Sequence, residues 1–180
     1  MRILAISGSL REASSNTAVL QAAAKLAPAD VKITLYDGLS RLPHFNPDLE
    51  EDNEISLVAD FRSQIKAADG VLISSPEYAH GVPGALKNAL DWVVGSGELV
   101  AKPVALINAS PRAVHAQASL TETLITMSAN LIVEAFIAVP LLGRKLDAQG
   151  IIADPENSDM VGAGLVVFVR AINCEATCHA

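Results

Sequence analysis

The chain has 180 residues, of which 51% are hydrophobic and 18% charged. This composition favours one well-buried domain over residues 1–180 and excludes disorder as the dominant state. The formal charge of −7 comes from 20 acidic against 13 basic side chains, so no diffuse positive field is available for nucleic acid or an anionic membrane surface. Because the charged share is below the usual figure of about a quarter, we expect some apolar surface to be buried between subunits.

Short apolar runs alternate with Ala- and Leu-rich segments of helical period. The runs have the length and β-branched content of strands covered on both faces. We expect such strands at Ile3–Ile6, Val31–Leu35, Val71–Ile73, Val104–Ile107 and Leu131–Val139. We expect helices at Ser15–Ala27, Ile55–Ala68, Gly84–Val94, His115–Ala129 and Asn157–Ile172. Regular alternation of this kind predicts an α/β fold with a doubly wound, five-stranded parallel sheet between two layers of helices.

No apolar stretch is suited to targeting or to crossing a membrane. The run Ile3–Ile6 is too brief for a signal-peptide core. The stretches Leu131–Leu142 and Leu165–Val169 are interrupted or far shorter than the roughly 20 residues that a membrane span requires. We therefore expect a cytoplasmic protein without a membrane partner.

Both cysteines, Cys174 and Cys178, lie close to the end of the sequence. A bridge between them would close only a tiny loop, which is unlike a secreted disulfide framework. On a helix both thiols would share one face beside His179, and a metal or redox site stays open as an alternative. We expect no metal site, because zinc needs more ligands than this cluster provides.

The loop after the first expected strand, residues 8–17, contains several hydroxyl groups, one amide and one guanidinium. Such a loop before a helix suits a phosphate, because the helix N-terminus supplies free N–H groups and a positive dipole. It has one glycine and no Gly-Lys-Ser/Thr ending, so it is neither a dinucleotide fingerprint nor a Walker A loop. Helix capping by Ser14, Ser15 or Asn16 is the alternative, but capping explains one of them and does not account for Ser9, Arg11 and Asn16 together.

The loop after the third expected strand, residues 74–84, combines two prolines and two glycines with polar and aromatic side chains. A rigid loop of this kind suits a flat heteroaromatic ligand. His80 is either a proton-transfer group or a residue of the pocket rim or of an interface. In the helix that follows, Lys87 and Asp91 have the spacing of a surface ion pair, and Trp92 is expected in the core or in an interface.

The loop after the fourth expected strand, residues 108–117, occupies the third position that faces a ligand in such sheets. Ser110 is a candidate contact, and the start of the next helix would direct a positive dipole toward the ligand. Arg112 has two alternatives, the phosphates of a nicotinamide cofactor or a surface salt bridge. His115 is expected to be a polar residue of the helix start.

Two separated motifs carry a family resemblance. They are Gly8-Ser9-Leu10-Arg11 with Ser15-Asn16, and Ser75-Pro76-Glu77-Tyr78 with Gly81 and the segment from Pro83 to Trp92. Together they resemble the NAD(P)H-dependent FMN reductase family, which includes chromate, quinone and azo-dye reductases. The residues from Leu42 to Leu49 also match the second loop of that family, so the resemblance covers most of the chain.

The resemblance implies a flavodoxin-like fold, FMN as the cofactor and NADPH or NADH as the reductant. It implies that Ser9, Arg11, Ser15 and Asn16 hold the phosphate, with Thr17 in the same loop. It further implies that Pro76, Glu77, Tyr78 and Gly81 line the isoalloxazine ring. Ala79 and His80 stand where many members have a small polar residue or asparagine, so the hydrogen bonds at the flavin edge stay open.

The function that follows is electron transfer from NAD(P)H through bound FMN to a small acceptor such as a quinone, free flavin, azo compound or metal oxyanion, chromate among them. Because the cofactor carries the chemistry, we assign no catalytic side chain. A flavodoxin-type carrier reduced by a protein partner and a phosphate- or nucleotide-binding regulatory module are the alternatives. The family also implies a homodimer or homotetramer, with Trp92 and the loop from Tyr36 to Asn53 near the contact.

Overall fold

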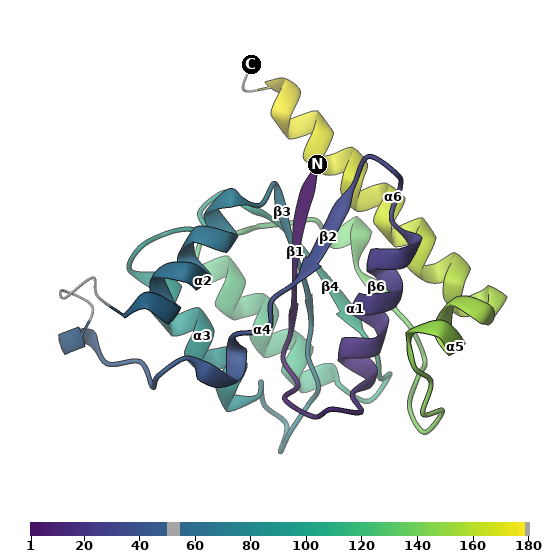
Figure 1. Ribbon diagram of the computed structural model, residues 1–180, viewed down its shortest axis with the longest axis horizontal. Coiled ribbons are helices and arrows are strands. Elements are labelled where there is room, and N and C mark those ends of the chain that lie inside the picture. Colours follow the sequence, from purple (N-terminus) through teal and green to yellow (C-terminus); the bar gives the residue numbers. More distant parts are fainter. Residues whose placement is uncertain (50–54, 179–180) are drawn as a thin grey trace.

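A parallel sheet forms the centre of the protein, for which a computed structural model describes residues 1–49 and 55–178, with side chains up to residue 174 (Figure 1). The strands are β1 (Arg2–Ser7), β2 (Lys32–Leu35), β3 (Gly70–Ser74), β4 (Pro103–Asn108), β5 (Asn130–Leu131) and β6 (Ile137–Ala138). The order is β2-β1-β3-β4-β5, with β6 also on β4, and every strand pairing is parallel. The chain reverses its direction of winding at β1, which confirms the doubly wound, flavodoxin-like expectation.

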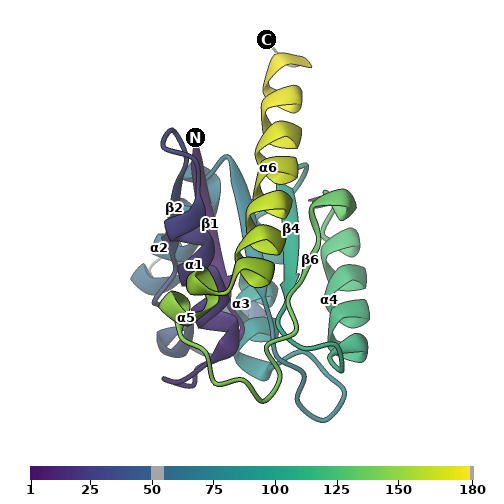
Figure 2. The same cartoon turned by 90° about the vertical axis from the view of Figure 1, so that its right-hand side faces the viewer.

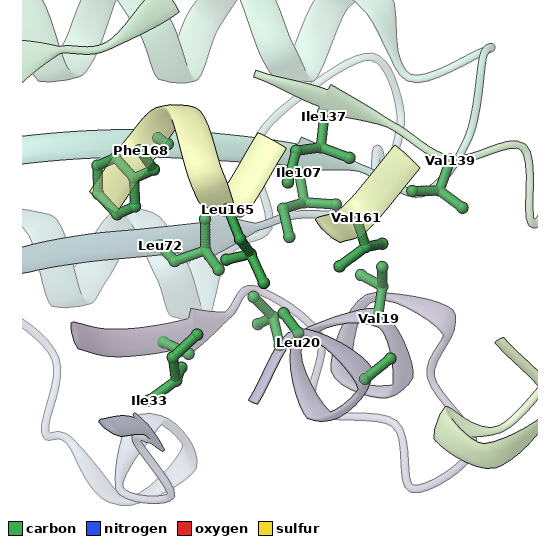
Figure 3. Packing of buried hydrophobic residues seen from close by; sticks show 14 of the residues in the cluster. Val19, Leu20, Ile33, Leu72, Ile107, Ile137, Val139, Val161, Leu165 and Phe168 are labelled. Atoms are coloured by element: carbon green, nitrogen blue, oxygen red, sulfur yellow. The ribbon is translucent and has the colours of Figure 1, made fainter. Parts of the chain in front are cut away.

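Helices cover both faces of the sheet (Figures 1 and 2). They are α1 (Ser15–Leu26), α2 (Ser56–Ala67), α3 (Gly84–Val94), α4 (Val114–Thr126), α5 (Ala148–Ala153) and α6 (Pro155–Cys178). One apolar cluster joins α1, α5 and α6 to one face of the sheet, and Figure 3 shows Val19, Leu72 and Leu165 within it. A second cluster joins α2, α3 and α4 to the other face. Both faces of the strands are therefore buried, as their apolar runs predicted.

The fifth strand is shorter and less regular than its sequence predicted. In place of one strand over Leu131–Val139, the chain forms β5, a 3₁₀ turn at Val133–Ala135 and then β6. Pairing with β4 continues on both sides of the turn, because the N–H of Ile132 donates to Val104 O and that of Val139 to Asn108 O, both at 2.9 Å. An edge strand has a partner on one side only, so the interruption leaves little pairing unmade.

The C-terminal region adds one helix that the sequence did not predict and extends another. Helix α5 begins after Asp147, whose Oδ1 accepts from the N–H of Gly150 at 2.7 Å, and α6 is longer than expected at both ends. Along the described part of the chain, no helix combines the length and the apolar character needed to cross a bilayer. Cys174 is exposed with a free thiol, whereas the side chain of Cys178 lies outside the described residues, so the paired-thiol alternative stays untested.

The long loop after β2 is fixed on α3. Pro43 O accepts hydrogen bonds from Asn88 Nδ2 at 2.9 Å and Trp92 Nε1 at 2.8 Å, and the N–H of Phe45 donates to Asn88 Oδ1 at 2.7 Å. Trp92 is 1% exposed and is therefore a core residue, so it offers no surface to a neighbouring subunit. The expected surface ion pair on α3 is present, with Lys87 Nζ 2.5 Å from Asp91 Oδ1.

Helix α6 passes close to β6 at Gly164. A Cβ atom there would lie 2.2 Å from Ile137 Cγ1, whereas one at Gly162 would meet nothing within 4 Å. Alanine is the better helix former at both positions, so we expect Gly162→Ala to stabilise the protein by about 0.5–1 kcal/mol. We expect Gly164→Ala to be less stable than Gly162→Ala by about 1–3 kcal/mol, because the side chains must shift. Urea unfolding of the two variants measures this difference, and equal stabilities would contradict the close approach.

Candidate functional site

A cavity of about 850 Å³ opens at the carboxyl ends of β1, β3 and β4. In Figure 1 this is the lower edge of the sheet, where the loops that follow these strands gather. Its walls come from four segments of the chain, at residues 9–21, 75–78, 109–113 and 142–147. The volume lies in the range of small-molecule and cofactor sites, and the position is where open α/β sheets bind ligands.

The first wall is the start of α1. Ser14 is the N-cap, because its Oγ accepts from the N–H of Thr17 at 3.3 Å and its carbonyl accepts from that of Ala18 at 2.8 Å. The N–H groups of Ser15 and Asn16 find no acceptor among residues 1–49 and 55–178. Capping therefore explains Ser14 and leaves two backbone donors at the positive end of a helix that lines the cavity.

Polar side chains of this wall are largely buried, and some are hydrogen-bonded to residues that do not line the cavity. Ser9 and Asn16 are each 8% exposed and line the cavity. The Oδ1 of Asn16 accepts from Ser74 Oγ at 2.9 Å, so its amide N–H groups remain to donate. The hydroxyl of Thr17 lies 2.8 Å from that of Ser7 and is thus engaged with the end of β1.

The second wall is the loop after β3. Pro76, Glu77 and Tyr78 line the cavity, but Gly81 does not. Gly81 instead closes a tight turn, in which its N–H donates to Tyr78 O at 3.0 Å and its carbonyl accepts from the Tyr78 N–H at 3.1 Å. The structure therefore brings three of the four expected ring-lining residues into the cavity and gives the fourth a role in shaping their loop.

The third wall follows β4. Ser110 lines the cavity, its N–H donates to Asn108 Oδ1 at 2.9 Å, and its Oγ accepts from the N–H of Arg112 at 3.3 Å. Arg112 is exposed and lines the cavity, and its guanidinium forms no ion pair with the described residues. The surface salt bridge, one of its two alternatives, is therefore not formed within them.

The start of α4 differs from its expected role. Glu77 Oε2 accepts from the N–H of Ala116 at 2.8 Å, so a carboxylate from the loop after β3 occupies the first turn of this helix. A carboxylate there offsets part of the positive helix dipole, which leaves less of it for a ligand than the sequence suggested. The same bond ties the second wall to the third.

The fourth wall, residues 142–147, was missed from the sequence. Arg144 is paired with Asp154, their atoms NH2 and Oδ2 being 2.5 Å apart, and this hydrogen bond lowers the pKa of Asp154. Lys145 lines the cavity from the same loop. The available signal was the segment Leu142-Gly143-Arg144-Lys145, a polar turn directly after the fifth apolar run, because its loop reaches the same sheet edge.

Among the described residues, three cations and three carboxylates line the cavity. Arg11, Arg112 and Lys145 line it from three different loops, and none of the three forms an ion pair with the described residues. Of the carboxylates that line the cavity, Glu77 is engaged with Ala116, Asp147 caps α5, and Glu12 is exposed on the first loop. A phosphate would therefore meet unpaired cations together with backbone and amide donors.

A family model described as NADPH-dependent FMN reductase matches residues 1–141. The chain belongs to this family. It is 34% identical over 166 residues to an NAD(P)H-dependent FMN reductase of Pseudomonas aeruginosa, with 89% of each chain covered. A quinone reductase of Escherichia coli is 29% identical over 175 residues, with 93% of each covered.

A solved structure supports the same membership. A flavoenzyme NAD(P)H:(acceptor) oxidoreductase from Paracoccus denitrificans superposes with a TM-score of 0.84 at 28% identity, covering 96% of this chain and 97% of the other. The resemblance drawn from the two motifs is therefore confirmed, and so is the flavodoxin-like fold that it implied.

Ser14 allows the capping role of the first wall to be tested separately from binding. We expect Ser14→Ala to lower the free energy of unfolding by about 0.5–2 kcal/mol, because the N–H of Thr17 loses its acceptor. Ser14→Asp should keep most of the stability, since aspartate is an equally good N-cap. Chemical denaturation measures both, and a Ser14→Ala variant as stable as the original would contradict the cap.

Proposed function

We propose that this protein is an NAD(P)H-dependent FMN oxidoreductase that passes electrons to a small acceptor, such as a quinone, free flavin, azo compound or metal oxyanion. The observation that carries the proposal is the cavity at the strand ends, where backbone donors, buried amide and hydroxyl groups and unpaired cations meet in a member of the NADPH-dependent FMN reductase family. We further propose that it acts as a single flavodoxin-like domain in the cytoplasm.

The first wall fits the FMN phosphate. Ser15 and Asn16 offer free backbone N–H groups, the Asn16 amide offers two donors, and the Ser9 hydroxyl is buried at the same place. Arg11 adds a cation that has no carboxylate partner in the described chain. Thr17 is a weaker member of this set, because its hydroxyl already contacts Ser7.

The second and third walls fit the ring. Pro76 and Tyr78 offer apolar cover, and the backbone N–H of Glu77 and the hydroxyl of Ser110 offer hydrogen bonds to the ring edge. Glu77 contributes by linking this loop to α4 through its bond to the N–H of Ala116. Gly81 contributes by closing the turn that shapes the loop. Arg112 is left to meet the phosphates of the nicotinamide cofactor.

When bound, FMN supplies the redox chemistry, accepting electrons from NAD(P)H and releasing them to the acceptor. The residues of the chain bind and orient: the first wall fixes the phosphate, and the loops after β3 and β4 set the plane of the ring. No side chain is required as a proton donor or acceptor. The rate then depends on how well the cavity presents one ring face to each partner in turn.

A flavodoxin-type carrier would use the same fold and cofactor but would accept electrons from a protein. The family membership does not favour this alternative. A regulatory module would bind an anionic ligand without flavin colour. On addition of NADPH, the flavin of a carrier would stay oxidised, and a regulatory module would have no flavin spectrum to change.

An absorption spectrum followed by stopped-flow mixing tests the proposal. We expect the purified protein to bind FMN at micromolar concentration and the bound flavin to bleach directly on addition of NADPH or NADH, with recovery on adding a quinone. We expect Arg112→Met to raise the KM for NADPH while leaving the FMN spectrum intact. Absence of FMN binding would overturn the proposal, and a bound flavin that neither nicotinamide reduces would favour the carrier.

The phosphate end is tested with two variants and one control. Arg11→Met removes a charged donor and should weaken FMN binding about tenfold. Ser14→Asp keeps the helix cap but places a carboxylate beside the phosphate, so its Kd for FMN should rise by about tenfold or more. Arg170→Met removes an exposed cation on α6 that does not line the cavity, and it should leave the Kd unchanged. Equal affinities for all three would place the phosphate elsewhere.

We also propose a homodimer, or a tetramer built from it, in which α4 supplies part of the contact. The exposed face of α4 includes Val114 at 57% and Ile125 at 54% exposure, and Glu122 is the only acidic or basic residue of this helix apart from His115. A helix face with so little charge is typical of a contact surface. Light scattering on a gel-filtration peak should give at least twice the mass of the 18.8 kDa chain. A stable monomer would remove this proposal and leave the flavin site untouched.

A further inference from the structure

The loop after β3 contains a turn that its own sequence does not favour. Ala79 and His80 both have left-handed backbones, with φ of 49° and 61°, between the paired residues Tyr78 and Gly81. A two-residue turn with both central residues left-handed usually has Asn-Gly there, since side chains with a Cβ are strained in this region. Such strain persists only where surrounding contacts hold the backbone.

Besides the two backbone hydrogen bonds between Tyr78 and Gly81, two contacts link this loop to the first turn of α4. The rings of His80 and His115 are stacked with their centroids 4.3 Å apart and their planes 8° from parallel. On the other side of Tyr78, Glu77 Oε2 accepts from the N–H of Ala116 at 2.8 Å. Figure 2 shows the loop between β3 and α3 at the lower edge of the sheet, beside the start of α4.

Tyr78 lies between these two anchors. Its side chain lines the cavity and is 49% exposed, so core packing does not fix its position. His80 and His115 do not line the cavity, so neither reaches a ligand there directly. The direction of the Tyr78 side chain thus depends on the backbone of residues 77–81, which two contacts tie to α4.

We propose that the stacked pair His80 and His115 is a positioning device, which with Glu77 fixes the strained turn on α4 and so holds Tyr78 as a wall of the ligand cavity. This inference rests on the proposed function for the identity of the ligand, FMN. It assigns neither histidine to proton transfer. The loop that covers the ring and the helix that follows β4 thereby behave as one unit.

The test compares loss of the ring with its replacement. Stacking of two rings depends on the ring faces, so His80→Phe and His115→Phe should preserve it, whereas His80→Ala and His115→Ala should not. We expect each alanine variant to raise the Kd for FMN about 2- to 10-fold and to change the visible circular dichroism of the bound flavin. The double alanine variant should be no worse than either single one, because both remove the same contact. The phenylalanine variants should restore both readouts.

His44→Ala is the matched control, because His44 is exposed on the loop after β2 and does not line the cavity. It should leave the Kd and the dichroism of the original protein. Alanine variants that bind FMN with unchanged Kd and unchanged dichroism would overturn the positioning role. Additive effects of the two alanine changes would also overturn it.

Hydrogen exchange separates this inference from the proposed function, since it needs no flavin. In the protein without ligand, we expect the N–H groups of Tyr78 and Gly81 to exchange faster in His80→Ala than in His80→Phe or His44→Ala, because their mutual hydrogen bonds open more often. Unchanged exchange at both positions would overturn the inference even if the protein binds FMN. Faster exchange in a protein that binds no FMN would uphold the turn and overturn only the flavin site.

Discussion

The site depends on the junction between the ends of β1 and β3. The N–H of Gly8 donates to Ser74 O at 2.8 Å, so the pairing of these strands continues one residue beyond β1. A Cβ at Gly8 would lie 2.9 Å from Ser75 Oγ and 3.2 Å from Ser75 Cα, so a larger residue would make its neighbours shift at this close approach. Ser74 is fully buried and its hydroxyl donates to Asn16, which fixes the start of α1 against the end of β3. The donors of the first wall and the aromatic loop of the second are brought together at this point.

Each wall of the cavity is anchored outside the cavity. Ser14 caps α1, Glu77 bonds to the start of α4, and Arg144 pairs with Asp154 behind the fourth loop. The groups that form these anchors are unavailable to a ligand. Arg11 and Lys145, in contrast, have no carboxylate partner in the described chain. An anionic ligand then meets donors that need little rearrangement, and such preorganisation reduces the cost of binding.

The low charge of the chain has two physical sources. Helices cover both faces of the central strands, so these strands are apolar on both sides. Most apolar side chains therefore lie in the two separate core clusters. The remainder is exposed, and α4 carries part of it at Val114 and Ile125. Trp92, which the composition alone could not place, belongs to the first category, because its ring is buried and its Nε1 donates to Pro43 O.

Local sequence determined the parts of this protein that depend on neighbouring residues. The alternation of apolar runs and helical segments predicted the layers, the bounds of α3 were correct at Gly84–Val94, and two strand-end motifs indicated the loops that line the cavity. Periodicity and capping act over a few residues, so they are visible in one dimension. The division of the fifth strand and the entry of residues 142–147 into the cavity came only with the tertiary structure. The bond of Glu77 to Ala116 and the stacking of His80 on His115 join residues far apart in the sequence, and only the packed sheet brings these partners into contact.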